Sequence, residues 1–249
     1  MSLIRFLLCF GILIAAFSNC QDTKSSRKES VISKQPDSIL TKKNKKISSE
    51  NTTEKSKNSD SISTEKPFKL TNENMKDFLL EYGEKNPETV VRLKTSHGNI
   101  DIQLFEKTPL HRANFIYLTK QNYFDETFFY RVAKGFVIQG GNSDREEMAL
   151  KRFQIGDDYT LPQEQVQGLS HTRGSVALSK QWVDNPSNRS TPFEFFIVVA
   201  KKGAHHLDGE HTIFGKVIRG MNVVDKISNV PVDGSEWPLK NIFITAEVL

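Results

Sequence analysis

The chain has 249 residues, of which 37% are hydrophobic and 26% charged, and its formal net charge is +4 at pH 7. This length suffices for one or two domains, and the 17 phenylalanines can supply a sizeable core. Both cysteines, Cys9 and Cys20, lie near the amino terminus, which excludes a structural disulfide or a cysteine-based metal site in the rest of the chain.

Residues 1–20 have the organisation of an export signal. Arg5 precedes an apolar run that is too short for a comfortable transmembrane helix. The segment Phe17-Ser18-Asn19-Cys20 resembles the end of a bacterial lipoprotein signal, in which the cysteine is lipidated. We therefore predict a lipid anchor on Cys20, attachment to a membrane, and a location in the cell envelope on its periplasmic or surface face. A plain cleaved signal peptide and an uncleaved anchor are the alternatives.

Residues 21–66 contain no aromatic side chain and carry eleven basic and seven acidic residues. This composition buries too little apolar surface to fold, so we predict a disordered polar tether. The lysine cluster at residues 42–46 resembles a nucleic-acid patch, but the nearby acidic residues and the export signal favour a solvated tether and no nucleic-acid partner. Residues 67–249 carry 22 basic and 23 acidic side chains, so the net charge indicates nothing about the ligand of the folded part.

A short helical extension is predicted over residues 67–88. The polar residues Thr71-Asn72-Glu73 are typical of a helix start, and Gly83 is predicted to end the helix. Its apolar residues share one face: Met75, Phe78, Leu79 and Tyr82.

Residues 89–249 contain many short strand patterns and only two helix patterns. One helix begins at Pro109 with Thr108 as its N-cap, the other covers residues 221–227, and residues 142–163 are expected to be loop. The lack of repeated strand–helix–strand alternation argues against a doubly wound parallel sheet, and a closed antiparallel barrel fits best. The predicted strands cover residues 90–95, 99–104, 128–132, 136–139, 174–179, 195–199, 212–217 and 241–248.

The stretch of residues 128–141 is apolar or aromatic apart from a few side chains, and two long polar ones, Arg131 and Gln139, interrupt it. An arginine in apolar surroundings is costly unless it is paired or directed at a ligand. The stretch alone therefore indicates either a functional site or an ordinary strand pair with an arginine that extends to solvent.

Six motifs, in this order along residues 89–249, resemble the cyclophilin family of peptidyl-prolyl cis–trans isomerases. The resemblance implies a mainly-β fold, a closed eight-stranded antiparallel β-barrel capped by two helices. The motifs are Phe129–Val132, Gly135–Gly141, Arg173–Ser179, Phe195–Ile197, Leu207–Val217 and Gly220–Val224.

The resemblance implies catalytic roles for Arg131, as a donor to the substrate, and for Gln139, which orients it. Rotation about an X-Pro bond meets a barrier of about 18–20 kcal/mol, and a guanidinium stabilises the twisted state without titrating. No metal is expected, because the adjacent His205 and His206 cannot both face one ion from a strand. No cofactor is expected either, since no phosphate loop or dinucleotide fingerprint occurs in the sequence. The implied substrate-binding residues are Phe136, Val137, Ser179, Glu194, Phe196, Leu207 and His211.

The chain departs from the family at several of these positions. Glu194 replaces the usual Gln, and as a carboxylate it can only accept hydrogen bonds, so it could pair with Arg131 or repel an acidic substrate. Ser179-Lys180 replaces Ala-Asn, and Val137 replaces Met. His206 stands where many members have a Trp that helps to hold cyclosporin, so we expect weak inhibition by that drug.

These observations predict a monomeric, envelope-anchored isomerase that acts on proline-containing segments during the folding of exported proteins. An alternative is a chaperone or adaptor that holds such segments with little catalytic activity. A third is a structural envelope lipoprotein with an inert barrel. No Gly-x-Ser-x-Gly elbow, phosphate loop or dinucleotide motif occurs in the sequence.

Overall fold

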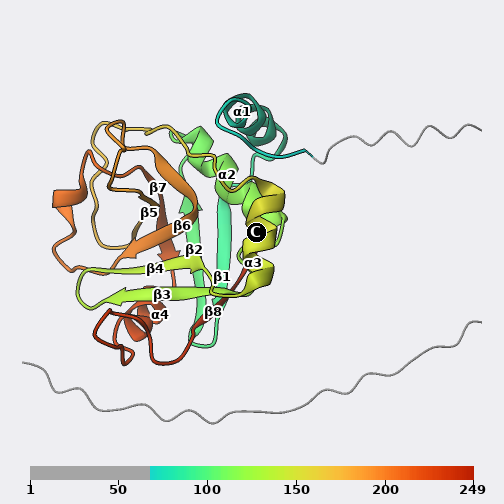
Figure 1. Cartoon of the computed structure of the whole chain (residues 1–249). Coiled ribbons are helices and arrows are strands. Elements are labelled where there is room, and N and C mark those ends of the chain that lie inside the picture. Colours follow the sequence, from blue (N-terminus) through green and yellow to red (C-terminus); the bar gives the residue numbers. More distant parts are fainter. Residues whose placement is uncertain (1–67) are drawn as a thin grey trace, which may run out of the picture. The chain divides into compact units, whose positions relative to one another are not determined.

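The structure, a computed structural model, describes residues 68–249. The predicted signal segment, its Cys20 and the predicted tether lie outside the described residues. Eight antiparallel strands close into a barrel in the order β1-β2-β7-β5-β6-β4-β3-β8 (Figure 1), which confirms the expected barrel. The strands are β1 (Val90–Thr95), β2 (Gly98–Leu104), β3 (Thr127–Ala133), β4 (Val137–Asn142), β5 (Ser175–Lys180), β6 (Ser190–Val198), β7 (Ile213–Arg219) and β8 (Phe243–Val248).

Alternate residues of the strands point to opposite sides of the barrel wall, as the pleat requires. In β4, Ile138 joins the main core inside the barrel, whereas Val137 belongs to a second apolar cluster outside it. The inner core contains fully buried aromatic residues, so it fills the barrel with side chains: Phe115, Phe129, Phe195 and Phe214.

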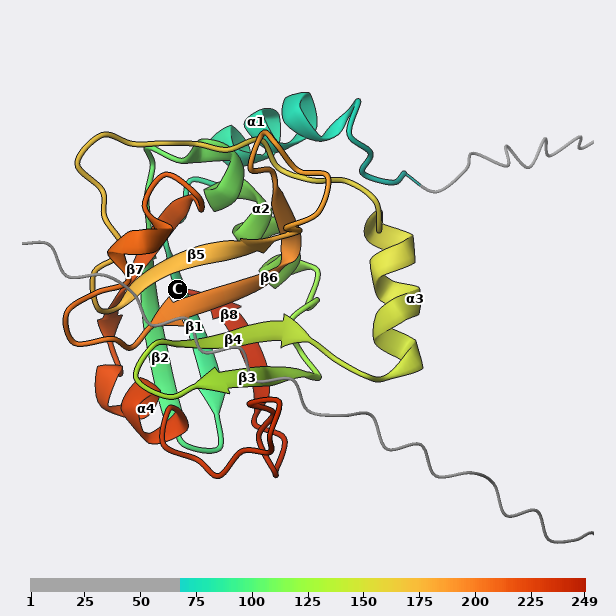
Figure 2. The ribbon, with the colours of Figure 1, turned by 60° about the vertical axis from the view of Figure 1, so that its left-hand side comes forward.

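Within residues 68–249, four α-helices accompany the barrel: α1 (Met75–Lys85), α2 (Pro109–Lys120), α3 (Glu146–Ile155) and α4 (Met221–Ile227). In Figure 2, α1 and α2 lie at one end of the barrel, α4 lies at the other, and α3 stands beside it. A short 3-10 turn, η1 (His205–Leu207), precedes β7.

Helix α3 corrects the expectation that residues 142–163 are loop. Its acidic first turn and Arg152 in the last turn suit the helix dipole, and Gly156 follows as C-cap. The apolar residues did not predict this helix, because Leu150 and Phe153 are exposed while only Met148 and Ile155 are buried. Met148 and Ile155 lie two helical turns apart with no buried apolar residue between them, so the helix lacks the continuous i, i+3, i+4 pattern that would have predicted it.

The start of α2 is capped differently from the prediction. The Thr108 side chain makes no cap bond and its hydroxyl donates to Phe105 O instead. The carboxylate of Glu164 accepts from the backbone N–H groups of Leu110, at 3.1 Å, and His111, at 3.0 Å. A distant carboxylate therefore satisfies the free N–H groups and the dipole of this helix.

Gly83 lies inside α1 and does not end it. Buried Arg112 of α2 approaches α1 closely at this point, and its Nη2 donates to Gly83 O at 2.9 Å. Its Nη1 donates to Asn86 O at 2.9 Å, so Arg112 satisfies carbonyls at the carboxyl end of α1. A side chain at residue 83 would come within 3.1 Å of Arg112 and Ala113, which explains the glycine.

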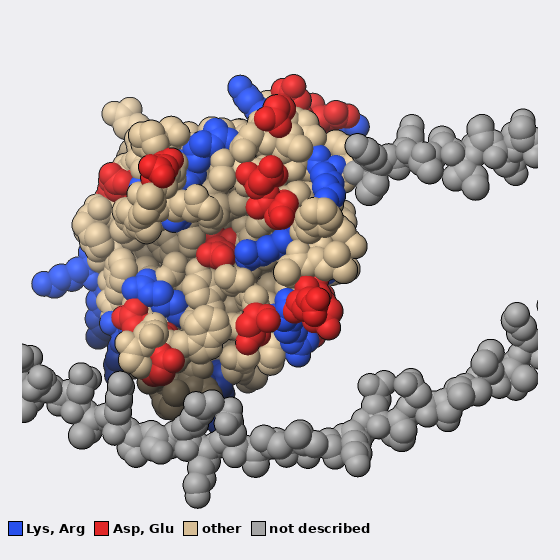
Figure 3. Space-filling model, in the orientation of Figure 1, with Lys and Arg blue, Asp and Glu red and all other residues tan. Residues whose placement is uncertain are grey.

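Within residues 68–249, no helix is both long and apolar enough to span a membrane. On the face shown in Figure 3, acidic and basic side chains are interspersed and form no large field of one sign. This distribution agrees with the near-neutral charge of residues 67–249.

Candidate functional site

Neighbouring strands β3 and β4 bring Arg131 and Gln139 together. The two residues are direct partners in the ladder, and Arg131 Nη1 donates to Gln139 Oε1 at 2.6 Å. The register shifts between Phe129 and Arg131, so Tyr130 is an extra, bulged residue. A bulge redirects the side chains beside it, and here Phe129 remains in the core while Arg131 reaches the outer surface.

The β3–β4 turn sets the position of Phe136 beside this pair. Phe136 N donates to Ala133 O at 3.0 Å, and Gly135 takes a φ of +76°, which glycine adopts without strain. The turn falls at the predicted break between the two strand runs.

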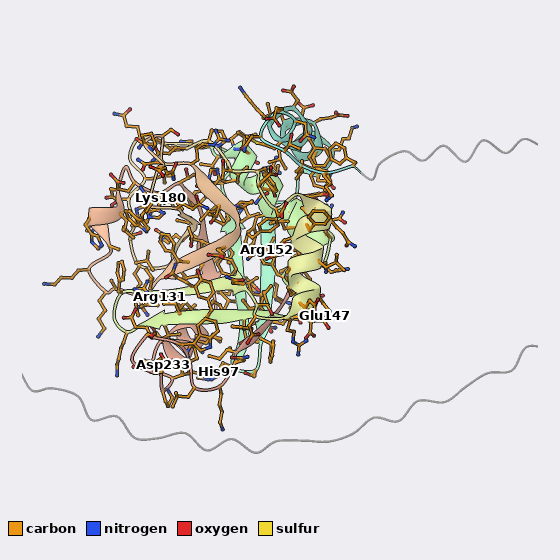
Figure 4. All side chains as sticks on the ribbon, viewed as in Figure 1. His97, Arg131, Glu147, Arg152, Lys180 and Asp233 are labelled. Carbon is orange, nitrogen blue, oxygen red and sulfur yellow. The ribbon has the colours of Figure 1, made fainter. Side chains whose placement is uncertain are left out.

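A cavity of about 120 Å³ opens on the outer face of these strands, at the second apolar cluster. A water molecule occupies about 30 Å³ of liquid, so the cavity has room for one small ring. In Figure 4, Arg131 and Lys180 lie on the side of the barrel away from α3. The lining residues are Arg131, Phe136, Val137, Gln139, Ser179, Lys180, Trp182, Phe196, Leu207 and His211.

His211 forms a neutral wall of the cavity. Its Nδ1 donates to Leu178 O at 3.0 Å, which leaves Nε2 as the unprotonated nitrogen. Burial lowers the pKa of His211 to about 4, and the hydrogen bond to Leu178 only partly opposes this shift. The ring meets Phe196 edge-on, with centroids 5.2 Å apart, so the cavity keeps an uncharged aromatic floor at neutral pH.

The part of the rim next to His211 carries the departures at Ser179 and Lys180, which directly follow Leu178 in β5. Gln139 Nε2 donates to Ser179 Oγ at 3.3 Å, so Ser179 helps to orient the amide that holds Arg131. Lys180 is buried, and its Nζ donates to Glu210 Oε2 at 2.6 Å and lies 4.5 Å from the centre of the Trp182 ring. The charge of Lys180 is thus compensated on the rim.

Glu194 lies outside the cavity lining and makes no ion pair with Arg131. Tyr130 Oη donates to Glu194 Oε2 at 3.0 Å, and Asn142 Nδ2 donates to Glu194 Oε1 at 2.9 Å. Arg152 of α3 lies 3.5 Å from the same Oε1. Burial, together with the neighbouring Glu194 carboxylate, raises the pKa of Tyr130, so its hydroxyl remains a donor.

A second hydrogen-bonded group, His171 with Asp208, packs against the cavity residue Phe196. His171 stacks on Phe196 and its Nδ1 lies 2.7 Å from Asp208 Oδ1. Burial opposes ionisation of Asp208, but hydrogen bonds from Ser170 and His171 outweigh it and lower its pKa to about 2. Residues 68–249 contain no group of three or more His, Cys, Asp or Glu side chains placed to hold a metal.

Two residues at this site were not identified from the sequence. Trp182 lines the cavity and is 70% exposed; the sequence offers only an aromatic residue beside the polar run of residues 184–190. Glu236 Oε2 lies 2.7 Å from Arg131 Nη2, and nothing in the sequence pattern connects Glu236 with β3.

A family model described as cyclophilin type peptidyl-prolyl cis-trans isomerase/CLD matches residues 90–248. The chain belongs to this family. A peptidyl-prolyl cis-trans isomerase of Acinetobacter baylyi is 38% identical over 149 residues, which cover 57% of this chain and 73% of the relative. A peptidyl-prolyl cis-trans isomerase-like 3 of Dictyostelium discoideum is 34% identical over 159 residues, which cover 62% of this chain and 91% of the relative.

A cyclophilin structure from Cryptosporidium parvum, determined in the presence of the dipeptide Ala-Pro, has a TM-score of 0.54 and 27% identity to this cyclophilin. The matched region covers 64% of this chain and 98% of the Cryptosporidium parvum chain. The family and its relatives establish peptidyl-prolyl cis–trans isomerisation as the activity of this cyclophilin.

At the position where the resemblance implies a Trp in many members of the family, this cyclophilin has His206, which lies at the edge of the cavity. Its ring stacks on Phe136, with centroids 5.3 Å apart and planes 28° apart. The smaller imidazole leaves less apolar surface at this edge than an indole would.

Proposed function

We propose that this cyclophilin isomerises X-Pro bonds in exported proteins and is held at the cell envelope by a lipid on Cys20. The observation that carries the catalytic part is the Arg131–Gln139 pair beside an apolar cavity of about 120 Å³. The export signal over residues 1–20 and the absence of cysteine after Cys20 support the anchored location.

The proline ring occupies the apolar cavity between Phe136, Phe196 and Leu207, where its burial leaves the preceding peptide bond at the rim beside Arg131. As this bond twists, resonance is lost and the prolyl nitrogen regains its lone pair. A guanidinium N–H of Arg131 donates to that nitrogen or to a nearby carbonyl, and stabilises the twisted state more than the planar one. Preorganised donors of this kind contribute about 3 kcal/mol, or roughly a hundredfold in rate.

The neutral His211 serves this reaction as an aromatic wall, and no proton transfer is required of it. No covalent intermediate forms, because rotation neither makes nor breaks a bond to the protein. The groups that act are therefore the guanidinium donor, its Gln139 support and the apolar floor.

The first experiment measures cis-to-trans conversion of an Ala-Pro peptide by the full chain. We expect Arg131→Ala to reduce kcat/KM about a hundredfold, and Arg131→Lys to remain severely impaired because an ammonium lacks the forked geometry. Equal rates for the wild type and Arg131→Ala would contradict the role of Arg131. If the wild type binds the peptide but is no faster than buffer, the chaperone or adaptor alternative replaces the enzyme.

The second experiment tests the anchor and the location. Radiolabelled palmitate should enter the wild-type protein and not Cys20→Ala, and the wild type should sediment with envelope membranes. Incorporation of label in both proteins would contradict the assignment of Cys20.

The third experiment tests the proposed role in folding. An exported protein with a slow, proline-limited refolding phase should refold faster with the wild type than with Arg131→Ala. Equal acceleration by both would point to a chaperone effect that does not depend on isomerisation.

A further inference from the structure

The guanidinium of Arg131 is held on two sides. Nη1 donates to Gln139 Oε1 at 2.6 Å, and Nη2 lies 2.7 Å from Glu236 Oε2. A guanidinium has five N–H donors. Gln139 accepts from one of them and the Glu236 carboxylate lies in ion-pair contact with Nη2, so further N–H donors remain for a substrate. Gln139 belongs to the family pattern, whereas Glu236 comes from the segment between α4 and β8.

The loop around Glu236 is built as a tight turn. Asp233 Oδ1 accepts from the backbone N–H groups of Ser235, at 2.8 Å, and Trp237, at 3.0 Å. Asp233 N donates to Trp237 O at 2.9 Å and closes the turn. In Figure 4, the labelled Asp233 lies on the same side of the barrel as Arg131.

This turn contacts β3 at Tyr130 and Val132, the residues that flank Arg131. Val132 N donates to Glu236 O at 2.8 Å, and the Trp237 ring packs 6.1 Å from that of Tyr130. Strand β8 pairs with β3 only at Thr127 and Phe128. The loop therefore covers the part of the β3 edge that β8 leaves free, and this brings the Glu236 carboxylate to Arg131.

Glu236 adopts a φ of +64°, in the left-handed region that side-chain-bearing residues disfavour. Glycine or asparagine would suit this backbone better. The positive φ therefore does not explain why this residue is a glutamate, and its side chain makes one ion pair, with Arg131. Unfavourable local conformations of this kind concentrate at functional sites.

We infer that Glu236 is a positioning residue for isomerisation. With Gln139 it holds the guanidinium from both sides, so the remaining N–H donors of Arg131 point toward the cavity before substrate arrives. Preorganisation of this kind acts on the rate of the chemical step more than on binding. The inference rests on the isomerase activity and on the role proposed for Arg131.

The test measures kcat and KM of the full chain on an Ala-Pro peptide. We expect Glu236→Gly to lower kcat about three- to tenfold with little change in KM, which corresponds to about 0.7–1.4 kcal/mol. Glu236→Gln keeps an oxygen acceptor and should retain most of the activity. Glu247→Gln is the matched control, because Glu247 is similarly exposed and pairs with Lys94, away from the cavity.

The glycine variant separates positioning from folding. Because glycine suits a φ of +64°, Glu236→Gly should unfold at the wild-type temperature or above it while kcat falls. Loss of the ion pair should also free the guanidinium to rotate about its Nε–Cζ bond. In nuclear magnetic resonance spectra, the signals of Nη1 and Nη2 of Arg131 should therefore interconvert faster in Glu236→Gly than in the wild type. Equal kcat in the wild type and Glu236→Gly, or a higher kcat in the variant, would overturn the inference. If the wild type itself is inactive, the enzyme assignment fails first.

Discussion

At the residue scale, His211 shows how burial determines the chemistry of the cavity. Its pKa is lowered to about 4 in the folded protein, whereas a free histidine titrates near 6.5. The ring is therefore neutral throughout the physiological range. The rate of isomerisation should not change between about pH 5.5 and about pH 8, since a guanidinium also stays charged there.

The same shift predicts a loss of stability in mild acid. Between about pH 6.5 and pH 4 the unfolded chain binds a proton that folded His211 does not, so the free energy of unfolding falls as pH decreases. The loss from this residue approaches about 3 kcal/mol at pH 4. Urea unfolding at pH 7.5 and pH 4.5 measures it, and His211→Asn should reduce the difference. A difference as large in His211→Asn would assign the effect to other groups.

His206 supports a second prediction at this scale. The imidazole stacks on Phe136 at the cavity edge, where the family resemblance places a Trp that helps to hold cyclosporin. His206→Trp should strengthen inhibition by cyclosporin about five- to tenfold, as expected for about 1 kcal/mol of added aromatic contact. Peptide isomerisation in the presence of the drug measures it. Submicromolar inhibition of the wild type would contradict the expectation.

At the scale of elements, helix α3, which the sequence pattern does not predict, contributes to the environment of Glu194. Arg152 of α3 and Asn142 at the end of β4 approach one oxygen of this carboxylate, and Tyr130 donates to the other. Glu194, which replaces the Gln usual in the family, is therefore held by hydrogen bonds and an ion pair to these three neighbours. The replacement places no free carboxylate in the cavity.

The cap of α2 gives a prediction at this scale. Glu164→Ala removes the acceptor of two backbone N–H groups and the partner of His111 Nδ1. We expect a loss of about 2 kcal/mol, or about 6 °C in Tm, because buried N–H groups lose their partner. Glu164→Gln should lose less. The exposed Gln167→Ala is the control, and an equal loss there would contradict the cap assignment.

At the scale of the whole molecule, the extension with α1 is part of the core and no residue of α1 lines the cavity. Leu79 of α1 is fully buried in that core, whereas the neighbouring Leu80 is partly exposed. Leu79→Ala should reduce the free energy of unfolding by about 3 kcal/mol and leave kcat/KM unchanged. Leu80→Ala should change neither, and chemical unfolding with the peptide assay measures both. A fall in kcat/KM for Leu79→Ala at a temperature where it is folded would indicate that α1 regulates the cavity.

The order of short strands and family motifs was enough to predict a closed barrel and to bring Arg131, Gln139 and Phe196 to one site. Strand alternation is a local property, and adjacent strands pair in a predictable way. Helix α3 was missed because its apolar residues are divided between the interior and the solvent. The cap on α2 was assigned to Thr108 because only a nearby side chain is visible in a local pattern.

The sequence by itself determined the barrel and predicted the Arg131–Gln139 pair and the apolar residues beside it. Strand patterns depend on residue type and spacing along the chain, and the ordered motifs of residues 89–249 resemble the family. Only the tertiary structure decided the partners of the charged groups. Arg131 meets Glu236, Glu194 meets Arg152, and Lys180 meets Glu210. Each of these partners comes from a separate element, and the closure of the barrel brings them together. Charges attract over short distances in space whatever their separation along the chain, so periodicity contains no information about these pairs.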